Sequence, residues 1–305
     1  MYLKDYFKII KFPIIFHKNW KELFFNIKYA YEYFVYSKKR SQKSKFYYIK
    51  KNKYNYFWYK TAQVHINFVL NYFEVKNYLR APFIAKTCSP IIFNNINNIN
   101  KDNFYTSRKI KNISRKLNKI FSYIKVDTFK HYLSNYNYFF SKKIIGNRNF
   151  KLIKNLDAVE IGPGLGFNSL LYSLYNKKLI FFYDLDYMIH LQQNIYNLLK
   201  KYFTIKKIYF ATEPEKLKNN IKNRYFVVGF NSLNEMPLTK RKLLEPLIKD
   251  SVFSLFTFNT SFEGVNNYKY FKKLSKKIKR KIIFKDYKFP NQRNFTNKHK
   301  YCIIQ

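Results

Sequence analysis

Glycine is scarce in this chain, and its placement constrains the fold more than any other feature. The sequence has only six glycines in 305 residues, and three of them, Gly162, Gly164 and Gly166, occur within five positions. A residue without Cβ allows the backbone to turn sharply between a strand and a helix and to approach a ligand closely. The cluster therefore predicts a tight strand-to-helix turn whose backbone lies beside a bound molecule.

After about residue 154, short apolar runs alternate with longer segments of helical periodicity, which is typical of a parallel sheet with helices on its faces. The predicted strands are Ala158–Ile161, Leu179–Tyr183, Lys207–Phe210, Tyr225–Phe230, Ser251–Phe258, Lys281–Phe284 and Lys300–Ile304. The predicted helices are Asn168–Leu174, Met188–Tyr202, Glu213–Asn220, Thr239–Ile248 and Tyr268–Lys279. The last connection lacks a strong helical pattern, so we expect the last two strands to form an antiparallel hairpin.

The first half of the chain has a different character. Before residue 150 there is one glycine, Gly146, and stretches rich in Lys and aromatic residues run at helical spacing. These predicted helices are Leu23–Tyr36, Val64–Tyr78, Ile110–Ile124 and Phe129–Phe140. We therefore expect a helical region over 1–145 that covers the cleft for the molecule on which the protein acts, its acceptor. The sheet domain is expected over 146–305.

The composition favours a folded protein and suggests anionic binding partners. Hydrophobic residues make up 47% of the chain, which excludes a disordered polymer, and the net charge is +42. Such a charge suggests nucleic acid or an anionic membrane surface, but the basic residues are spread over both halves rather than focused in one stripe. Nucleic acid is therefore an open but not favoured partner. A run from Lys272 to Lys281 is explained as well by a solvated helix face.

Location is predicted from what the sequence does not contain. Its two cysteines, Cys88 and Cys302, have neither disulfide-framework nor zinc-ligand spacing, which indicates a reducing compartment. No stretch of 18 consecutive apolar residues occurs, so no transmembrane segment is expected. We expect a cytoplasmic protein, with peripheral contact at the inner membrane surface as an open alternative.

Two acidic residues beside the glycine cluster indicate the ligand. Glu160 precedes the first glycine, where a carboxylate would repel a pyrophosphate but attract the amino group of an aminoacyl ligand. Asp184 ends the next predicted strand, where an acid can accept both hydroxyls of a ribose. No Gly-Lys-Ser/Thr occurs, which excludes a P-loop. A nucleoside bearing an amino acid satisfies both acids, and S-adenosylmethionine is such a molecule, whereas NAD does not require Glu160.

With this motif, residues of about 150–305 resemble the class I S-adenosylmethionine-dependent methyltransferases, whose α/β fold is a Rossmann-like seven-stranded sheet. The resemblance implies S-adenosylmethionine as cofactor. The residues it implies at the cofactor are Glu160, Gly162, Gly164, Gly166, Asp184, Leu185 and Asn231.

Two branches of these enzymes compete. The ribosomal RNA adenine dimethyltransferases have a similar cofactor loop and suit a basic surface, but their Asn-(Leu/Ile)-Pro-(Tyr/Phe) signature is missing. After the fourth predicted strand this chain instead reads Phe-Asn-Ser-Leu-Asn-Glu-Met-Pro over 230–237.

The second branch is the sugar O-methyltransferases, which the chain resembles at three places. The cofactor loop over 160–166 is similar, although Pro163 and Leu165 replace the usual Gly and Tyr. The Tyr-Asp-Leu at 183–185, followed by Leu-Gln-Gln at 191–193, resembles their Asp-Leu-Pro and Leu-Gln-Gln element. The Asn-Ser-Leu-Asn-Glu-Met at 231–236 resembles their Asn-Ser-(Phe)-x-Glu-Met element. The resemblance implies methyl transfer to a sugar hydroxyl of a surface polysaccharide or its precursor.

The catalytic candidates follow from where a parallel sheet binds its ligands, at the carboxyl ends of the strands. Glu235 is expected near the acceptor as a general base, the alternative being a helix cap or an ion pair with Lys240. His131 is a second candidate base from the N-terminal region. The expected acceptor contacts are Ser232, Asn234 and Asn259, and no metal site is predicted. A non-enzymatic function is the remaining alternative: an inactive methyltransferase-like protein that binds polyanions or membrane surfaces.

Overall fold

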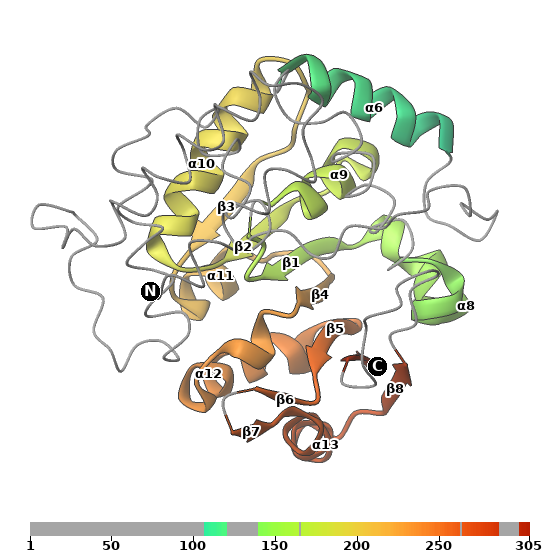
Figure 1. The fold of residues 1–305 in the computed structure, drawn as a ribbon, viewed down its shortest axis with the longest axis vertical. Coiled ribbons are helices and arrows are strands. Elements are labelled where there is room, and N and C mark those ends of the chain that lie inside the picture. Colours follow the sequence, from blue (N-terminus) through green and yellow to red (C-terminus); the bar gives the residue numbers. More distant parts are fainter. Residues whose placement is uncertain (1–106, 121–139, 165, 263, 287–298) are drawn as a thin grey trace, which may run out of the picture. The chain divides into compact units, whose positions relative to one another are not determined.

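The computed structural model describes residues 107–120, 140–164, 166–262, 264–286 and 299–305, which form a twisted seven-stranded sheet with helices on both faces (Figure 1). The strands of the sheet are β1 (Asp157–Ile161), β2 (Ile180–Tyr183), β3 (Ile208–Ala211), β4 (Tyr225–Phe230), β5 (Ser254–Asn259), β8 (Ile282–Asp286) and β9 (His299–Ile304). Their spatial order is β3-β2-β1-β4-β5-β9-β8. The first five strands are parallel, and β9 runs antiparallel to both β5 and β8.

The helices alternate with these strands along the chain. They are α6 (Ser107–Ile120), α8 (Lys142–Leu152), α9 (Phe167–Asn176), α10 (Asp186–Lys200), α11 (Pro214–Asn220), α12 (Leu238–Asp250) and α13 (Asn267–Lys277). Short 3-10 turns stand at η2 (Ile153–Asn155) and η3 (Leu233–Glu235), and β6 (Ser261–Phe262) pairs with β7 (Val265–Asn266) in a small hairpin.

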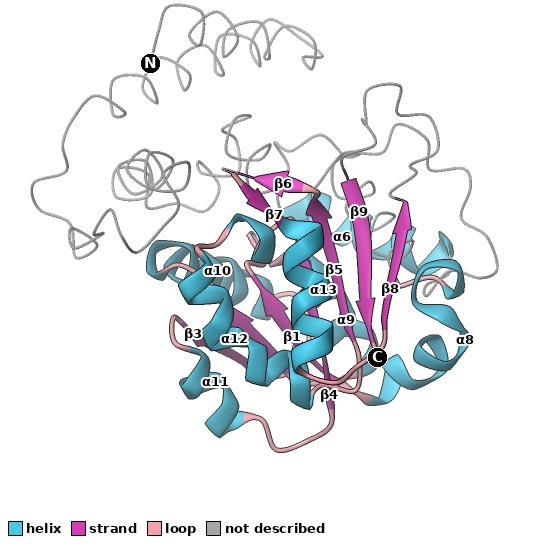
Figure 2. Ribbon diagram, turned by 90° about the horizontal axis from the view of Figure 1, so that it is seen from below, coloured by secondary structure: helices cyan, strands magenta, loops and turns pink. Residues whose placement is uncertain are grey.

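Alternation of side chains along the strands assigns the helices to opposite faces. On one face, Val159, Val227 and Phe256 pack in a single core with apolar residues of α11, α12 and α13, such as Leu217 and Leu244. Figure 2 shows α12 and α13 in front of the strands. The opposite face packs against α9 and α10 through aromatic contacts such as Tyr172 with Phe226 and Tyr196 with Phe210. Burial on both faces explains why these strands read as continuous apolar runs.

Ring contacts hold much of this interior together. The Phe226 ring lies 5.1 Å from Tyr172 in an edge-to-face arrangement and stacks on Phe253 at 5.4 Å, centroid to centroid. Such pairs add about 0.5–1.5 kcal/mol each beyond the area they bury. The high aromatic content is therefore largely core in the sheet domain.

The sequence-based expectations for residues 154–305 are confirmed in the number of sheet strands, in their type and in the antiparallel β8–β9 pairing. The helix α8 was not predicted, because Gly146 adopts φ +82° inside it and interrupts the helical periodicity. The strand expected from Ser251 begins at Ser254, since the Ser251 hydroxyl instead bonds the Ile248 carbonyl at the end of α12.

Only a small part of the predicted N-terminal region lies among the described residues. Within it, α6 spans Ser107–Ile120 where a helix over Ile110–Ile124 was expected, and its Ile113, Leu117 and Ile120 are buried. The other three helices predicted there lie outside the described residues, apart from Phe140, and the domain boundary stays a prediction. None of the helices in the described ranges is long and apolar enough to cross a membrane.

Candidate functional site

The glycine cluster forms the turn between β1 and α9, and its backbone requires glycine. Gly162, Gly164 and Gly166 have φ values of +62°, +59° and +73°, a left-handed region that is costly for other residues. A Cβ at Gly162 would lie 2.3 Å from the Cβ of Ser232, and one at Gly166 would lie 2.7 Å from Cε2 of Phe182. The glycines thus allow the turn to pack tightly against Ser232, which follows β4, and against Phe182 of β2.

Glu160 lies in β1, beside β2, and is 1% exposed. Its Oε2 accepts a hydrogen bond from the backbone N of Ser169 at 3.2 Å and another from the Ser169 hydroxyl, both in the first turns of α9. Burial, together with the nearby charge of Asp184, raises the pKa of Glu160 to about 8, although the bonds from Ser169 oppose the shift. A positive ligand group near this carboxyl would reverse that shift, because an opposite charge favours the ionised form.

Asp184 follows β2 at the same edge of the sheet. Its Oδ1 accepts from the backbone N of Leu185 at 2.8 Å, and its Oδ2 accepts from Nε2 of Gln192 at 2.7 Å. The residue as a whole retains some exposure, yet burial of the carboxyl group raises its pKa to about 7. Gln192 also donates to the carbonyl of Gly164 at 2.8 Å, so it connects this acid to the glycine turn.

The chain turns abruptly after β4, at the neighbouring position of the same edge. Asn231 has φ +54°, a conformation that Asn tolerates better than most residues, and its backbone N donates to the Thr257 carbonyl of β5 at 2.9 Å. The Ser232 hydroxyl donates to the carbonyl of Ile161, next to the glycine turn. The side-chain oxygen of Asn231 is buried and has no hydrogen-bond partner within the described part of the chain.

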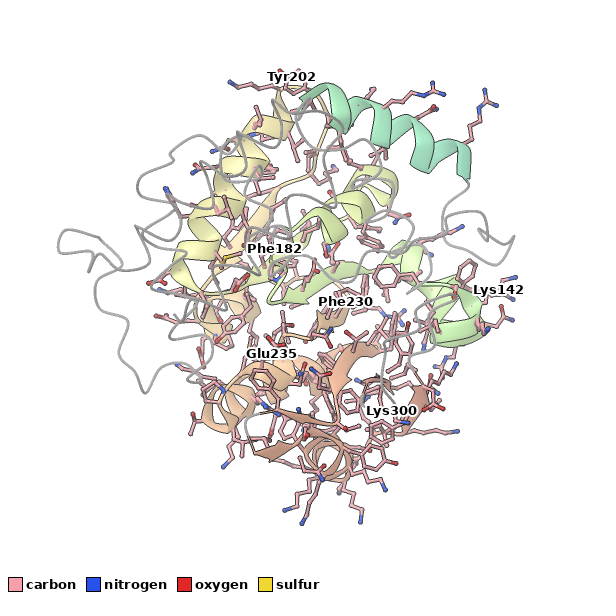
Figure 3. All side chains as sticks on the ribbon, viewed as in Figure 1. Lys142, Phe182, Tyr202, Phe230, Glu235 and Lys300 are labelled. Atoms are coloured by element: carbon pink, nitrogen blue, oxygen red, sulfur yellow. The ribbon has the colours of Figure 1, made fainter. Side chains whose placement is uncertain are left out.

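The other predicted acceptor residues lie in the segments that follow β4 and β5. Glu235 ends the 3-10 turn η3 and is partly buried, and Figure 3 shows it on the segment between β4 and α12. Asn259 ends β5 and is partly buried. Asn234 is only 1% exposed, and among the described residues neither polar atom of its side chain has a hydrogen-bond partner.

A buried arginine holds these two segments together. Arg241 of α12 is fully buried and donates to the Met236 carbonyl at 2.8 Å from Nε and to the Asn234 carbonyl at 2.5 Å from Nη2, so it binds the backbone on both sides of Glu235. Its Nη1 donates to Oδ1 of Asn267 at 2.6 Å. Burial lowers the pKa of Arg241 to about 10, so it stays cationic at neutral pH.

Asn267, the first residue of α13, extends this connection to β5. Its Nδ2 donates to the Asn259 carbonyl at 2.9 Å, and its backbone N donates to the Thr260 carbonyl at 2.9 Å. Arg241 and Asn267 therefore form a polar strut between the segment that carries Glu235 and the end of β5.

The remaining predictions concern metal ions and histidine. No group of three or more His, Cys, Asp or Glu side chains in the described ranges could hold a metal ion. His131 lies outside the residues that the structure describes, so its predicted role stays a prediction.

The strand order and the position of the glycine turn decide the architecture. Five parallel strands with β1 central, a reversed strand β9 inserted between β5 and β8, and a glycine turn after β1 are all present. The fold is that of a class I methyltransferase. Ligands of such sheets bind outside the carboxyl ends of the parallel strands, which is the edge where Glu160, Asp184 and Glu235 are found.

The similarity of this chain to known proteins is distant. No protein-family model matches the sequence, and no curated protein is similar to it at a significant level. Among solved structures, the methyltransferase domain of bacterial CtHen1 is similar with a TM-score of 0.40 and 10% identity, over 53% of this chain and 97% of that one. Magnesium protoporphyrin IX methyltransferase from Synechocystis PCC 6803, solved with bound S-adenosylmethionine, is similar with a TM-score of 0.38 and 12% identity, over 75% of this chain and 94% of that one. The 16S rRNA methylase ArmA is similar with a TM-score of 0.34 and 14% identity, over 63% of this chain and 95% of that one.

For several residues near this edge, no functional role was predicted from the sequence. Ser169 and Gln192 bond the two acids, and each lies within ten positions of its partner, so a search for donors one or two helical turns into α9 and α10 could have found them. Arg241 and Asn267 carried no such signal, because a Lys-rich chain offers many basic residues and nothing local distinguishes a buried one.

Proposed function

We propose that this chain binds S-adenosylmethionine at the carboxyl ends of β1 and β2 and transfers its methyl group to a hydroxyl of a sugar acceptor. The observation that carries the proposal is the pair of buried carboxyl groups, Glu160 and Asp184, on either side of a glycine turn and close enough that the charge of Asp184 contributes to the raised pKa of Glu160. Two adjacent buried acids with raised pKa values favour a ligand that brings a positive charge and hydroxyl donors.

The residues present fit this cofactor. Glu160 would hold the ammonium group of the methionyl part, and Asp184 would accept from the ribose hydroxyls. Two buried acceptor atoms at the same edge of the sheet, Oε1 of Gln192 and Oδ1 of Asn231, have no partner among the described residues and so offer further bonds to a polar ligand. When bound, the cofactor would supply an electrophilic methyl group.

The acceptor half of the reaction belongs to the segments after β4 and β5. Glu235 would take the proton of the acceptor hydroxyl, and Asn259 would hold a neighbouring hydroxyl of the sugar. Ser232 would contribute through the glycine turn instead, since its hydroxyl already donates to Ile161. The similarity of residues 231–236 to the sugar O-methyltransferase element supports a sugar, while the charge of +42 supports RNA as the alternative acceptor.

Cofactor binding is the first test, and calorimetry with S-adenosylmethionine and S-adenosylhomocysteine measures it directly. Glu160→Gln and Asp184→Asn should each weaken binding by about tenfold or more, because bonds to charged groups contribute about 1.5–3 kcal/mol. Asp250→Asn is the matched control, since this exposed acid precedes β5 at the opposite edge of the sheet and should leave affinity unchanged. Absence of binding by the unmodified protein would refute the proposal.

The acceptor class is tested separately by transfer of a radiolabelled methyl group to fractionated glycans and to RNA from the source cell. Label in glycan supports the sugar acceptor. Label in RNA, with an affinity that falls steeply as salt rises, would replace it with the RNA alternative.

A further inference from the structure

Gln192 does more in the site than offer its Oε1 to a ligand, because its amide nitrogen joins two parts of the site. It lies on α10, is 2% exposed, and its Nε2 donates at 2.7 Å to Oδ2 of Asp184 and at 2.8 Å to the carbonyl of Gly164. One side chain thus bonds both the acid after β2 and the glycine turn after β1. No other bond between Asp184 and a side chain of α10 is present among the described hydrogen bonds.

The two acceptors fix the orientation of the amide. The Gly164 carbonyl can only accept a hydrogen bond, so the NH₂ group of Gln192 must face it, and its two protons serve one acceptor each. The donors of Gln192 are therefore fully used. Its Oε1, on the same amide carbon, is buried and has no hydrogen-bond partner within the described ranges.

We propose that Gln192 is a positioning residue of the cofactor site, which locks the Asp184 carboxylate against the glycine turn before the ligand binds. This inference rests on the proposed binding of S-adenosylmethionine. A side chain that is free to rotate loses conformational entropy when a ligand fixes it. The bond from Gln192 already holds Oδ2 of Asp184 in one orientation, so less entropy is lost on binding. Gln192 acts through Asp184, and its uncommitted Oε1 adds an acceptor at the same spot.

The lock also affects the charge state of the acid. Burial raises the pKa of Asp184, and the bonds from the Leu185 backbone, from Gln192 and from the Gly164 backbone oppose that shift. Glu160 on β1 and Tyr183 on β2 are the titratable neighbours coupled to Asp184 in the described residues. Removing the Gln192 bond should raise the pKa of Asp184 further, so the ionised acid would form only at higher pH.

The test is calorimetric binding of S-adenosylhomocysteine between pH 5.5 and 8.5. Gln192→Met keeps the size of the side chain and removes its donors, and we expect affinity to fall about tenfold and the pH midpoint of binding to move to higher pH. Gln193→Met is the matched control, because Gln193 is the next residue of α10 and is exposed. It should bind with the affinity and the pH profile of the unmodified protein.

Two further variants separate positioning from general damage to the fold. Gln192→Glu can donate one hydrogen bond only when its carboxyl is protonated, so its deficit relative to the unmodified protein should be small at pH 5.5 and large at pH 8. In an Asp184→Asn background, Gln192→Met should add little to the loss, because the two residues act as one unit.

The outcomes discriminate between the two proposals. If the unmodified protein binds but Gln192→Met keeps both its affinity and its pH profile, or if the losses from positions 184 and 192 are additive, the role of Gln192 is refuted while the proposed function stands. If the unmodified protein does not bind, the proposed function fails and the role of Gln192 falls with it.

Discussion

The two halves of the candidate site are built from opposite charges. Beside the glycine turn, the buried groups are the carboxyls of Glu160 and Asp184, which accept hydrogen bonds from the neutral donors Ser169, Leu185 and Gln192, and both have raised pKa values. After β4 and β5, the fully buried charge is the Arg241 cation, which donates hydrogen bonds to two backbone carbonyls and to one side-chain amide oxygen. The first half therefore has anionic capacity left for a ligand, whereas in the second half the charge is used to hold backbone segments in place.

If this contrast is correct, the largest effect of any substitution comes from removing Arg241. Arg241→Met would leave the carbonyls of Asn234 and Met236 and the Asn267 amide without their donor inside the protein, and we expect a loss of about 3 kcal/mol in the free energy of unfolding. Urea unfolding measures it, with Lys242→Met, an exposed neighbour on α12, as the control.

The same variant tests whether the halves are independent. At a temperature where Arg241→Met is still folded, its affinity for S-adenosylmethionine should stay within about threefold of the unmodified protein, because the hydrogen bonds of Arg241 in the described part of the chain go to Asn234, Met236 and Asn267, outside the β1–β2 half. A cofactor affinity that collapses in the folded variant would show that the contrast between the halves is wrong.

The next largest effect is expected at Glu235, and it should appear in turnover rather than in binding. Glu235→Gln removes the proposed proton acceptor, so kcat on a competent acceptor should fall about 100-fold while cofactor affinity is unchanged. Steady-state methyl transfer, with calorimetry on the same preparation, measures both. Full turnover with unchanged affinity would refute the catalytic role of Glu235.

The contrast also explains what the sequence could predict. The first half lies within one β-turn-α-β unit, where scarce glycines stand next to an acid and a second acid ends the following strand, so local patterns placed Glu160, the turn and Asp184 correctly at one edge of the sheet. The seven strands were predictable for the same reason, because burial on both faces leaves continuous apolar runs.

The second half could not be assembled from local patterns. Its strut joins Arg241 and Asn267, which are 26 positions apart on different helices, and both bond mainly to backbone carbonyls that no side-chain pattern reveals. The burial of Asn234 illustrates the same limit: its environment, 1% exposed beside the strut, is set by tertiary packing, and the ligand contact expected of it stays a prediction.

A smaller effect would sharpen the account of the first half. Ser169→Ala removes the hydroxyl donor to Glu160 but keeps the backbone donor, so the pKa of Glu160 should rise and affinity for S-adenosylmethionine should fall about fivefold at pH 7. Ser173→Ala, also buried in α9, bonds the Lys178 carbonyl and is the control. Equal losses in both variants would mean that the effect comes from packing of α9 rather than from Glu160.

The last prediction concerns the pH dependence of stability that Glu160 contributes. Its pKa rises from about 4.5 to about 8 on folding, so the folded protein binds this proton more tightly than the unfolded chain. The resulting stabilisation is fully present below the unfolded pKa and is lost as pH rises through about 8. Because the other acids and the large positive charge also titrate, the measured quantity is the difference between the unmodified protein and Glu160→Gln, followed by thermal unfolding from pH 4.5 to 8.5. The stability of the unmodified protein relative to Glu160→Gln should fall steadily with rising pH in the ligand-free protein, and saturating S-adenosylmethionine should largely remove this slope, since the ammonium group favours the ionised carboxyl. A difference independent of pH would mean that Glu160 is ionised throughout, and the electrostatic contrast between the two halves would then have to be abandoned.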